Sequence, residues 1–190
     1  MDAIQPSYER VRSAVAARLG NQALAVESAP PDAVRVRIPG SAVRPAVEAL
    51  LHGCGARFLV SVGSDRREAE ESFAVVHLFS LDSEHVFVAL ECAVPPDDPH
   101  IPSVTDLIPG AGWSEREFRD VVGVVPDGHP DPRRLLLRDD WPEGLHPLRR
   151  DVPYDVRPAP VEGVAPRLAD QPPGATVLPI GPFFPVLEEP

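Results

Sequence analysis

The proline content of the C-terminal region sets the main limit on how this 190-residue chain can fold. Residues 151–190 contain ten of its 25 prolines and no apolar repeat long enough for a helix. Because proline lacks an amide hydrogen and has a nearly fixed φ, such a segment favours extended polyproline conformation and builds no core. We therefore expect the folded domain before residue 151, and residues 152–190 as an extended arm that lies along a partner.

Apolar periodicity before residue 113 predicts an α+β domain. Residues 7–19 and 41–53 carry apolar side chains at helical spacing. Strand-like runs occupy residues 34–38, 57–62, 73–81 and 85–92. The charged residues 64–72 are expected to form an exposed loop. The expected fold is a small mixed or antiparallel sheet of about four strands with helices packed on one face.

Charge and cysteine content exclude several classes of function. The net charge is −11, and all 18 basic residues are arginine. Binding to nucleic acid needs a basic face, so a nucleic-acid partner is not expected. Two distant cysteines, Cys54 and Cys92, do not supply an iron–sulfur cluster or a structural zinc site. Neither a signal peptide nor a membrane span is apparent, which predicts a cytoplasmic protein that contacts a membrane only through partner subunits.

The stretch from residue 113 to 151 concentrates charge, His, Pro and Gly. Its first part predicts a short helix, with Glu115 and Glu117 near the N-terminus and Gly123 where the helix stops. The remainder is punctuated by proline and predicts loops that display their charged side chains. We therefore divide the chain into an α+β domain at 1–123, loops at 124–151 and the arm at 152–190.

Two histidines in these loops raise the possibility of a metal site. His129 and His146 lie near acidic residues, namely Asp131, Asp139 and Asp140. The separation of the two histidines matches no established zinc-binding spacing. Each histidine immediately precedes proline, which favours an extended backbone. We expect each imidazole to fix a loop through a hydrogen bond, and keep a free-standing metal-dependent enzyme as the alternative.

The carboxylates of the predicted helix have two possible roles. Glu115, Glu117 and Asp120 could hold a general acid or base. The preferred interpretation is that they pair with arginines, because guanidinium groups bind carboxylates through two parallel hydrogen bonds. The candidate arginines are Arg116, Arg119, Arg133, Arg134, Arg149 and Arg150. Neither a phosphate-binding loop nor a nucleophile motif is present.

The same stretch resembles the C subunit of bacterial respiratory complex I, whose mitochondrial counterpart is iron–sulfur protein 3 of NADH:ubiquinone oxidoreductase. A related module occurs in energy-converting [NiFe] hydrogenases, including formate hydrogenlyase. The resemblance covers about forty residues, and the order of helices and strands before it agrees with that family. Its signature residues are Glu115, Arg116, Glu117, Asp120, Gly123, Gly128, His129, Pro130, Asp131, Arg134, His146, Pro147, Leu148, Arg149, Arg150 and Asp151.

This resemblance implies a subunit that binds no cofactor and has no active site of its own. In that family the subunit belongs to the peripheral arm. It packs against the quinone-site or hydrogenase large subunit and against the small iron–sulfur subunit, and its C-terminal segment wraps over the large subunit. The parent complex would carry iron–sulfur clusters and a NiFe centre or a flavin. Attachment to the cytoplasmic membrane would then run through these partners.

The last residues carry a second resemblance, to the opening of the large subunit. Residues 178–190 contain Gly181-Pro182, but Phe183 and Phe184 stand where that family has Gln and His. This departure and the closing Glu-Pro resemble the hydrogenase branch, and the chain resembles a split or truncated relative of a fused protein. We therefore expect a subunit of an energy-converting [NiFe] hydrogenase. The alternatives are the C subunit of an NADH:quinone oxidoreductase and an assembly chaperone for the hydrogenase.

Overall fold

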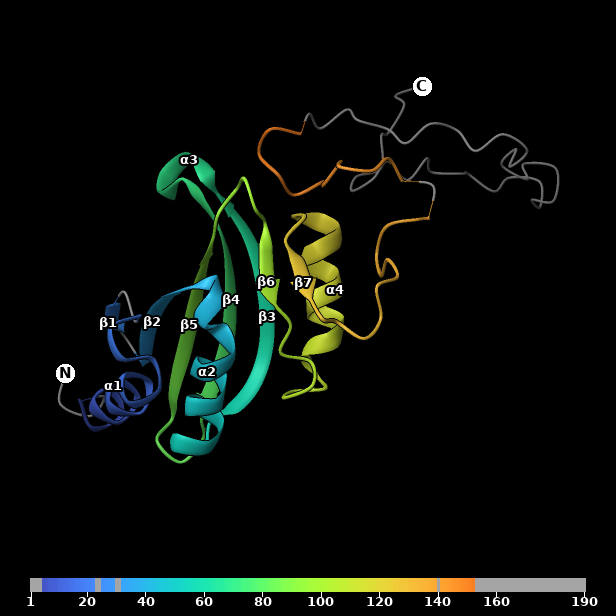
Figure 1. The fold of residues 1–190 in the computed structure, drawn as a ribbon. Coiled ribbons are helices and arrows are strands. Elements are labelled where there is room, and N and C mark those ends of the chain that lie inside the picture. The colour runs from blue at the N-terminus through green and yellow to red at the C-terminus, as the bar shows by residue number, and fades with distance from the viewer. Residues whose placement is uncertain (1–4, 23–24, 30–31, 140, 153–190) are drawn as a thin grey trace, which may run out of the picture.

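The computed structural model describes residues 5–22, 25–29, 32–139 and 141–152 and is built around a five-stranded mixed sheet (Figure 1). Its strands are β1 (Ala25–Ala29), β2 (Ala33–Pro39), β3 (Arg57–Arg66), β4 (Ser72–Leu81) and β5 (Val86–Val94). The spatial order is β1-β2-β5-β4-β3. Only the β2–β5 pair is parallel; the other neighbours are antiparallel. The α+β class is confirmed, but the sheet has one strand more than the sequence indicated.

The additional strand, β1, escaped prediction because its sequence has little apolar alternation. Ala-Val-Glu-Ser-Ala is half-exposed or exposed throughout, as suits an edge strand. A smaller parallel pair was also missed: β6 (His100–Pro102) and β7 (Val125–Asp127) are three residues each. Strands this short show no measurable period in a sequence.

Four α-helices occur in the described part of the chain. They are α1 (Gln5–Leu19), α2 (Val43–Glu48), α3 (Arg67–Glu70) and α4 (Ala111–Val121). α2 continues into a π-helical turn at Ala49–Gly53, and single 3₁₀ turns occur at Gly20–Gln22 and Gly40–Ala42. α3 and the end of β3 replace the loop expected at residues 64–72. No described helix has the length and apolar character needed to cross a membrane.

One hydrophobic core joins the sheet to α1, α2 and α4. Alternate residues of β2 are fully buried, and their neighbours on β5 and β4 follow the same alternation. Val15 of α1, Val47 of α2 and Phe118 of α4 belong to the same cluster. Since one set of alternate strand positions meets all three helices, the helices cover the same face of the sheet. This agrees with the layered arrangement expected from the sequence.

Close contact between α4 and β3 depends on Gly63. A Cβ atom at this position would lie 2.6 Å from the Cβ of Phe118, which is 2% exposed. Only glycine therefore lets the helix axis approach the strand this closely. The result is that α4 is held beside β3 and β7 (Figure 1), and the loops after β7 begin next to the helix.

Candidate docking surface

The C-terminus of α4 is closed by residues from the second signature segment. The last carbonyl groups of a helix find no donor within the helix and need donors from outside it. Here His146 Nδ1 donates to the carbonyl of Asp120 at 2.9 Å, and the amide of Leu148 donates to the carbonyl of Val121 at 2.9 Å. Arg149 Nε donates to the carbonyl of Val122 at 2.7 Å. The His-Pro-Leu-Arg segment therefore acts as a helix cap.

Gly123 makes this cap sterically possible. Its φ is +84°, a left-handed conformation that glycine adopts without strain. A Cβ at this position would lie 2.5 Å from His146 Cδ2 and would also overlap the guanidinium of Arg149. The imidazole and the guanidinium thus occupy the space that any other residue would fill.

Asp120 fixes the middle of the loop through its side chain. Its Oδ2 accepts hydrogen bonds from the amides of Leu135, Leu136 and Leu137 at 2.7, 2.9 and 3.2 Å. The carboxylate is buried, with 4% of the residue exposed. Three converging amide dipoles stabilise its negative charge where solvent is excluded. Asp120 therefore anchors the loop and forms no ion pair with an arginine in the described residues.

A second anchor joins the end of the loops to the end of β3. Asp65 accepts hydrogen bonds from the side chain of Arg67 and, at 3.0 Å, from the amide of Arg150. Arg67 also pairs with Asp151 at 2.7 Å. The Arg67 guanidinium is the main cause that holds the pKa of the Asp65 carboxyl well below its usual range. We call Asp65, Arg67, the Arg150 amide and Asp151 the latch.

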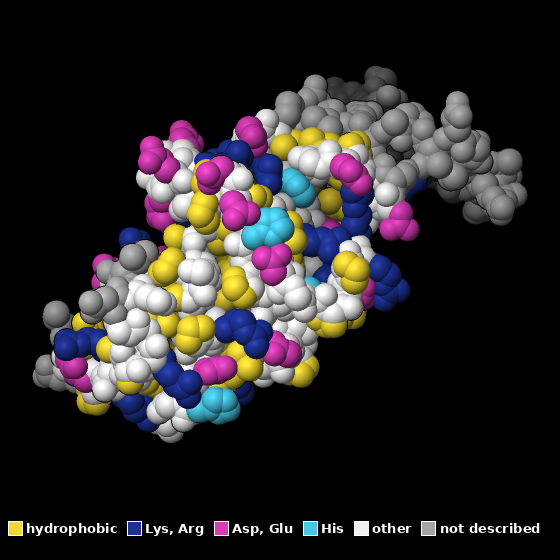
Figure 2. Space-filling model, in the orientation of Figure 1, with side chains coloured by type: hydrophobic (Ala, Val, Ile, Leu, Met, Phe, Trp, Pro, Cys, Tyr) yellow, Lys and Arg dark blue, Asp and Glu magenta, His cyan; other side chains and the backbone are white. Residues whose placement is uncertain are grey.

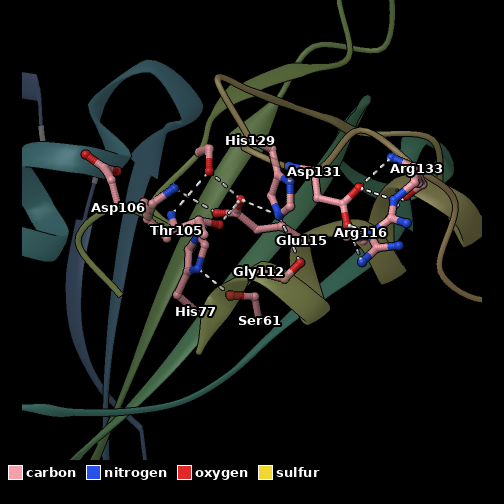
Figure 3. A network of polar contacts seen from close by, with 12 residues as sticks. Ser61, His77, Thr105, Asp106, Gly112, Glu115, Arg116, His129, Asp131 and Arg133 are labelled. Carbon is pink, nitrogen blue, oxygen red and sulfur yellow. Dashed lines mark hydrogen bonds and ion pairs between the residues drawn. The ribbon is translucent and has the colours of Figure 1, made fainter. Parts of the chain in front are cut away.

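Glu115 forms a buried network that ties α4 to the loop before it (Figure 3). Only 1% of Glu115 is exposed. Its carboxylate accepts hydrogen bonds from Ser103 Oγ at 2.5 Å, the Val104 amide at 2.7 Å and Thr105 Oγ1 at 2.8 Å. All three partners are donors, so the ionised side chain satisfies them. The expected pairing of Glu115 with an arginine is therefore wrong.

His129 completes the network with both ring nitrogens engaged (Figure 3). The amide of Asp131 donates to Nδ1 at 3.0 Å, which leaves the hydrogen on Nε2 to be donated to the carbonyl of Gly112, also at 3.0 Å. Glu115 Oε2 lies 4.0 Å from Nε2, beyond hydrogen-bond range. The loop-fixing role predicted for His129 and His146 is confirmed by these contacts.

The arginines of the stretch bind other partners than those predicted. Arg116 and Arg133 both pair with Asp131, at 3.0 and 2.8 Å, and these arginines hold the pKa of the Asp131 carboxyl below its ordinary value. Arg134 donates to the carbonyls of Arg138 and Trp141. The Arg149 guanidinium lies 5.0 Å from the ring centre of Phe73, and Arg150 pairs with Glu68. In the described residues, Glu117 forms no ion pair.

A metal site at the two histidines finds no support in the geometry. The described residues include no group of three or more His, Cys, Asp or Glu side chains that could hold a metal ion. Asp140, one of the acidic residues considered, lies outside them. His77, which the sequence presented as an ordinary strand residue, is 1% exposed and hydrogen-bonded to Ser61 Oγ at 2.7 Å. Burial lowers the pKa of His77 to about 4, so it is neutral near neutral pH.

Several side chains around these anchors remain exposed. Trp113 on α4 is 73% exposed, and Leu136 and Leu148 in the loops are 57% and 56% exposed. The guanidinium side chains of Arg133 and Arg150 are 81% and 66% exposed. Figure 2 shows charged and His side chains gathered around the α3 end of the sheet and the loops that follow β7. We call these five residues the display surface.

The remaining signature residues fall into the same two groups. Gly128 and Pro130 are exposed in the loop after β7, and Pro147 is half-buried beside the helix cap. Residues 153–190, including the predicted arm and the large-subunit-like segment, lie outside the described residues. The signature is therefore mostly an internal framework with a few displayed side chains. Sequence reasoning identified the residues of the framework but not their partners, because the partners are main-chain groups.

An α+β domain whose helix α4 is capped by its own downstream loops is the class of protein that these features define. The family model "Respiratory-chain NADH dehydrogenase, 30 Kd subunit" matches residues 36–158, and the chain belongs to this family. The matched region includes the network around α4, the helix cap and the latch. The resemblance to the C subunit of complex I is thereby confirmed.

Curated relatives include hydrogenase components and complex I subunits. The chain is 33% identical to hydrogenase-4 component G of Escherichia coli (strain K12), covering 96% of this chain and 34% of that protein. It is 36% identical to formate hydrogenlyase subunit 5 of the same organism, covering 84% and 29%. With the C subunit of the NADH-quinone oxidoreductase of Nocardioides sp. it shares 44% over 49% of this chain and 36% of that one. The chain thus spans about a third of the length of these relatives.

Solved structures show the same fold. A trypsin-resistant fragment of Nqo5 superimposes with a TM-score of 0.54 at 24% identity, covering 68% of this chain and 98% of the fragment. A chain of the archaeal membrane-bound sulfane sulfur reductase superimposes with a TM-score of 0.61 at 19% identity, covering 75% and 84%. At these identities the likeness concerns the fold.

Proposed function

We propose that this chain is a non-catalytic peripheral-arm subunit of a complex I-like, membrane-bound oxidoreductase, and that it docks the large subunit and the small iron–sulfur subunit. The observation that carries this proposal is the use of the signature residues. Glu115, Asp120, His129 and His146 are each engaged with main-chain groups of the loops or of α4. Side chains committed in this way hold a surface in shape, which is what a docking protein requires.

The hydrogenase branch is favoured by coverage. Hydrogenase-4 component G aligns with 96% of this chain and formate hydrogenlyase subunit 5 with 84%, against 49% for the complex I subunit of Nocardioides. The alternative, the C subunit of an NADH:quinone oxidoreductase, is favoured by the higher identity of 44% within the shorter match. In either case the clusters, and a NiFe centre or flavin, would belong to other subunits of the complex. The chain would then lie on the cytoplasmic side, attached to the membrane through them.

The geometry narrows which side chains can contact a partner. Charge reversal at Arg149 and Arg150 together would disturb the helix cap as well as the surface, because Arg149 bonds to Val122. Trp113, Arg133 and Arg150 are better probes, since their side chains point to solvent. Aromatic and arginine side chains commonly contribute most of the binding energy at protein interfaces.

The test is co-purification of the tagged full-length chain from its own host in mild detergent. We expect a nickel-binding large subunit and a small iron–sulfur subunit in stoichiometric amounts. Recovery of NADH-dehydrogenase flavoprotein subunits instead would support the alternative branch. A Trp113→Ala, Arg133→Glu variant should lose partner while keeping its melting temperature. Recovery of the chain alone, under conditions that preserve the complex, would contradict the proposal.

A further inference from the structure

A cavity of about 180 Å³ lies between the C-terminal half of α4 and the loop at residues 134–146. A single water molecule needs only roughly 10–15 Å³ of such space, so the cavity can admit a side chain. Its walls combine apolar and cationic groups. The residues that matter for the argument are Arg119, Arg134, Leu137, Pro142, Leu145 and His146.

Arg119 provides a cation without an internal counter-charge. It is half-buried on α4, and no hydrogen bond or ion pair joins it to another residue in the described part of the chain. Most other arginines in the domain are paired; Arg57 with Asp82 and Arg44 with Asp106 are examples. Arginine forms strong paired hydrogen bonds with carboxylates, so Arg119 has unused binding capacity.

Arg134 adds a second positive charge. Its Nη1 donates to the carbonyls of Arg138 and Trp141, at 2.9 and 2.6 Å, and these neutral acceptors leave the charge uncompensated. Asp120 is the acidic side chain that lines the cavity, but its Oδ2 is held by three loop amides. The remaining walls include Leu137, Pro142 and Leu145, which suit the methylene groups of a side chain.

We propose that this cavity receives the carboxylate of an Asp or Glu side chain from a partner protein of the complex, with Arg119 as the principal binding group and Arg134 as the second. The inference rests on the proposed function and adds to it the chemistry of one contact. An anionic side chain is selected because both guanidinium groups face the cavity from a chain whose overall charge is −11. The apolar walls exclude water and so strengthen the contact.

The chain offers an unusually clean test because all 18 of its basic residues are arginine. An Arg119→Lys variant therefore carries a single lysine, and a carbodiimide couples lysine to a neighbouring carboxylate without a spacer. The co-purified complex is treated with the carbodiimide, and cross-linked peptides are identified by mass spectrometry. An Arg12→Lys variant is the matched control, since Arg12 lies on α1 and its side chain is 58% exposed.

We expect the Arg119→Lys complex to yield a cross-link to an Asp or Glu of another protein of the complex, and the Arg12→Lys complex to lack it. An intact Arg119→Lys complex in which that lysine forms no cross-link to a partner would overturn the inference and leave the proposed function standing. A chain that never co-purifies with a partner would overturn the proposed function itself.

A second variant measures the strength of the contact. Arg119→Gln should weaken binding of the chain to its partner by about tenfold to a hundredfold, the usual range for a charge-assisted hydrogen bond at an interface. Its melting temperature should match that of the parent chain, because Arg119 has no partner among the described residues. Unchanged affinity in a normally folded Arg119→Gln variant would also overturn the inference.

Discussion

The imidazole of His146 donates its Nδ1 hydrogen to the main-chain carbonyl of Asp120, 26 positions earlier in the chain, at 2.9 Å. With the Leu148 amide and the Arg149 guanidinium, it satisfies consecutive carbonyls at the end of α4. A helix end that is normally capped by adjacent residues is here capped by a distant segment. The shape of the loops at 124–152 is therefore coupled to the stability of the helix.

Gly123 should tolerate substitution less well than Gly128. Both have positive φ, +84° and +80°, so alanine costs about 1–2 kcal/mol of backbone strain at either position. Only at Gly123 would the new methyl group overlap His146 and Arg149. We expect Gly123→Ala to lower the free energy of unfolding by about 1–3 kcal/mol more than Gly128→Ala. Equal losses in urea denaturation would contradict the close packing described for the helix cap.

Glu115 and Glu117 provide a matched pair on one helix. Glu115→Gln would place an amide group among three donors, so at least one buried donor loses its acceptor. We expect a loss of about 1.5–3 kcal/mol in the free energy of unfolding. Glu117→Gln, at an exposed position, should change it by less than about 0.5 kcal/mol. Thermal denaturation of both variants decides, and indistinguishable stabilities would show that the network contributes little.

Arg149 and Arg150 should differ although they are neighbours. Arg149→Gln removes the hydrogen bond to Val122 and the contact with the Phe73 ring, which together should cost about 2 kcal/mol. Arg150→Gln removes only an exposed pair with Glu68, and its amide still bonds to Asp65. That variant should stay within about 0.5 kcal/mol of the parent. Denaturant titration that ranks the two variants in the opposite order would refute the assignment.

The latch should make stability depend on pH through Asp65. Hydrogen bonding to Arg67 lowers the folded-state pKa of this carboxyl, so its contribution is complete above the unfolded pKa of about 3.9 and is lost as pH falls below it. The difference in unfolding free energy between the parent and Asp65→Asn should therefore be constant from about pH 7 to 5 and shrink toward pH 3. A difference that does not vary over that range would exclude the latch as the cause.

Fold class was accessible from sequence because the long elements have clear periods. The alternation of Val34, Val36 and Ile38 identified β2, and its buried side is the one observed. β1 and the β6–β7 pair were not accessible, since pairing with a distant strand defines them and their own sequences carry no period. The resemblance of residues 115–151 to a family located the site.

Contacts within the site were harder to foresee. An excess of arginine beside Glu115 and Asp120 suggested ion pairs, but both carboxylates bind main-chain amides, with hydroxyl groups added at Glu115. Amides leave no trace in a sequence, because every residue except proline has one. Likewise, no sequence pattern indicated that Asp65 and Arg67 would meet Asp151 across more than eighty residues. The arm at 152–190 remains a prediction from composition and resemblance.

Native mass spectrometry of the full-length chain, isolated gently from its own host, tests the central claim most directly. We expect the chain to occur in a complex with an iron–sulfur subunit and a larger subunit, and to leave on dissociation with the mass of the polypeptide alone. A chain that flies free of partners with a metal ion, cluster or flavin bound to it would contradict the claim that it positions electron-carrying neighbours and performs no redox step itself.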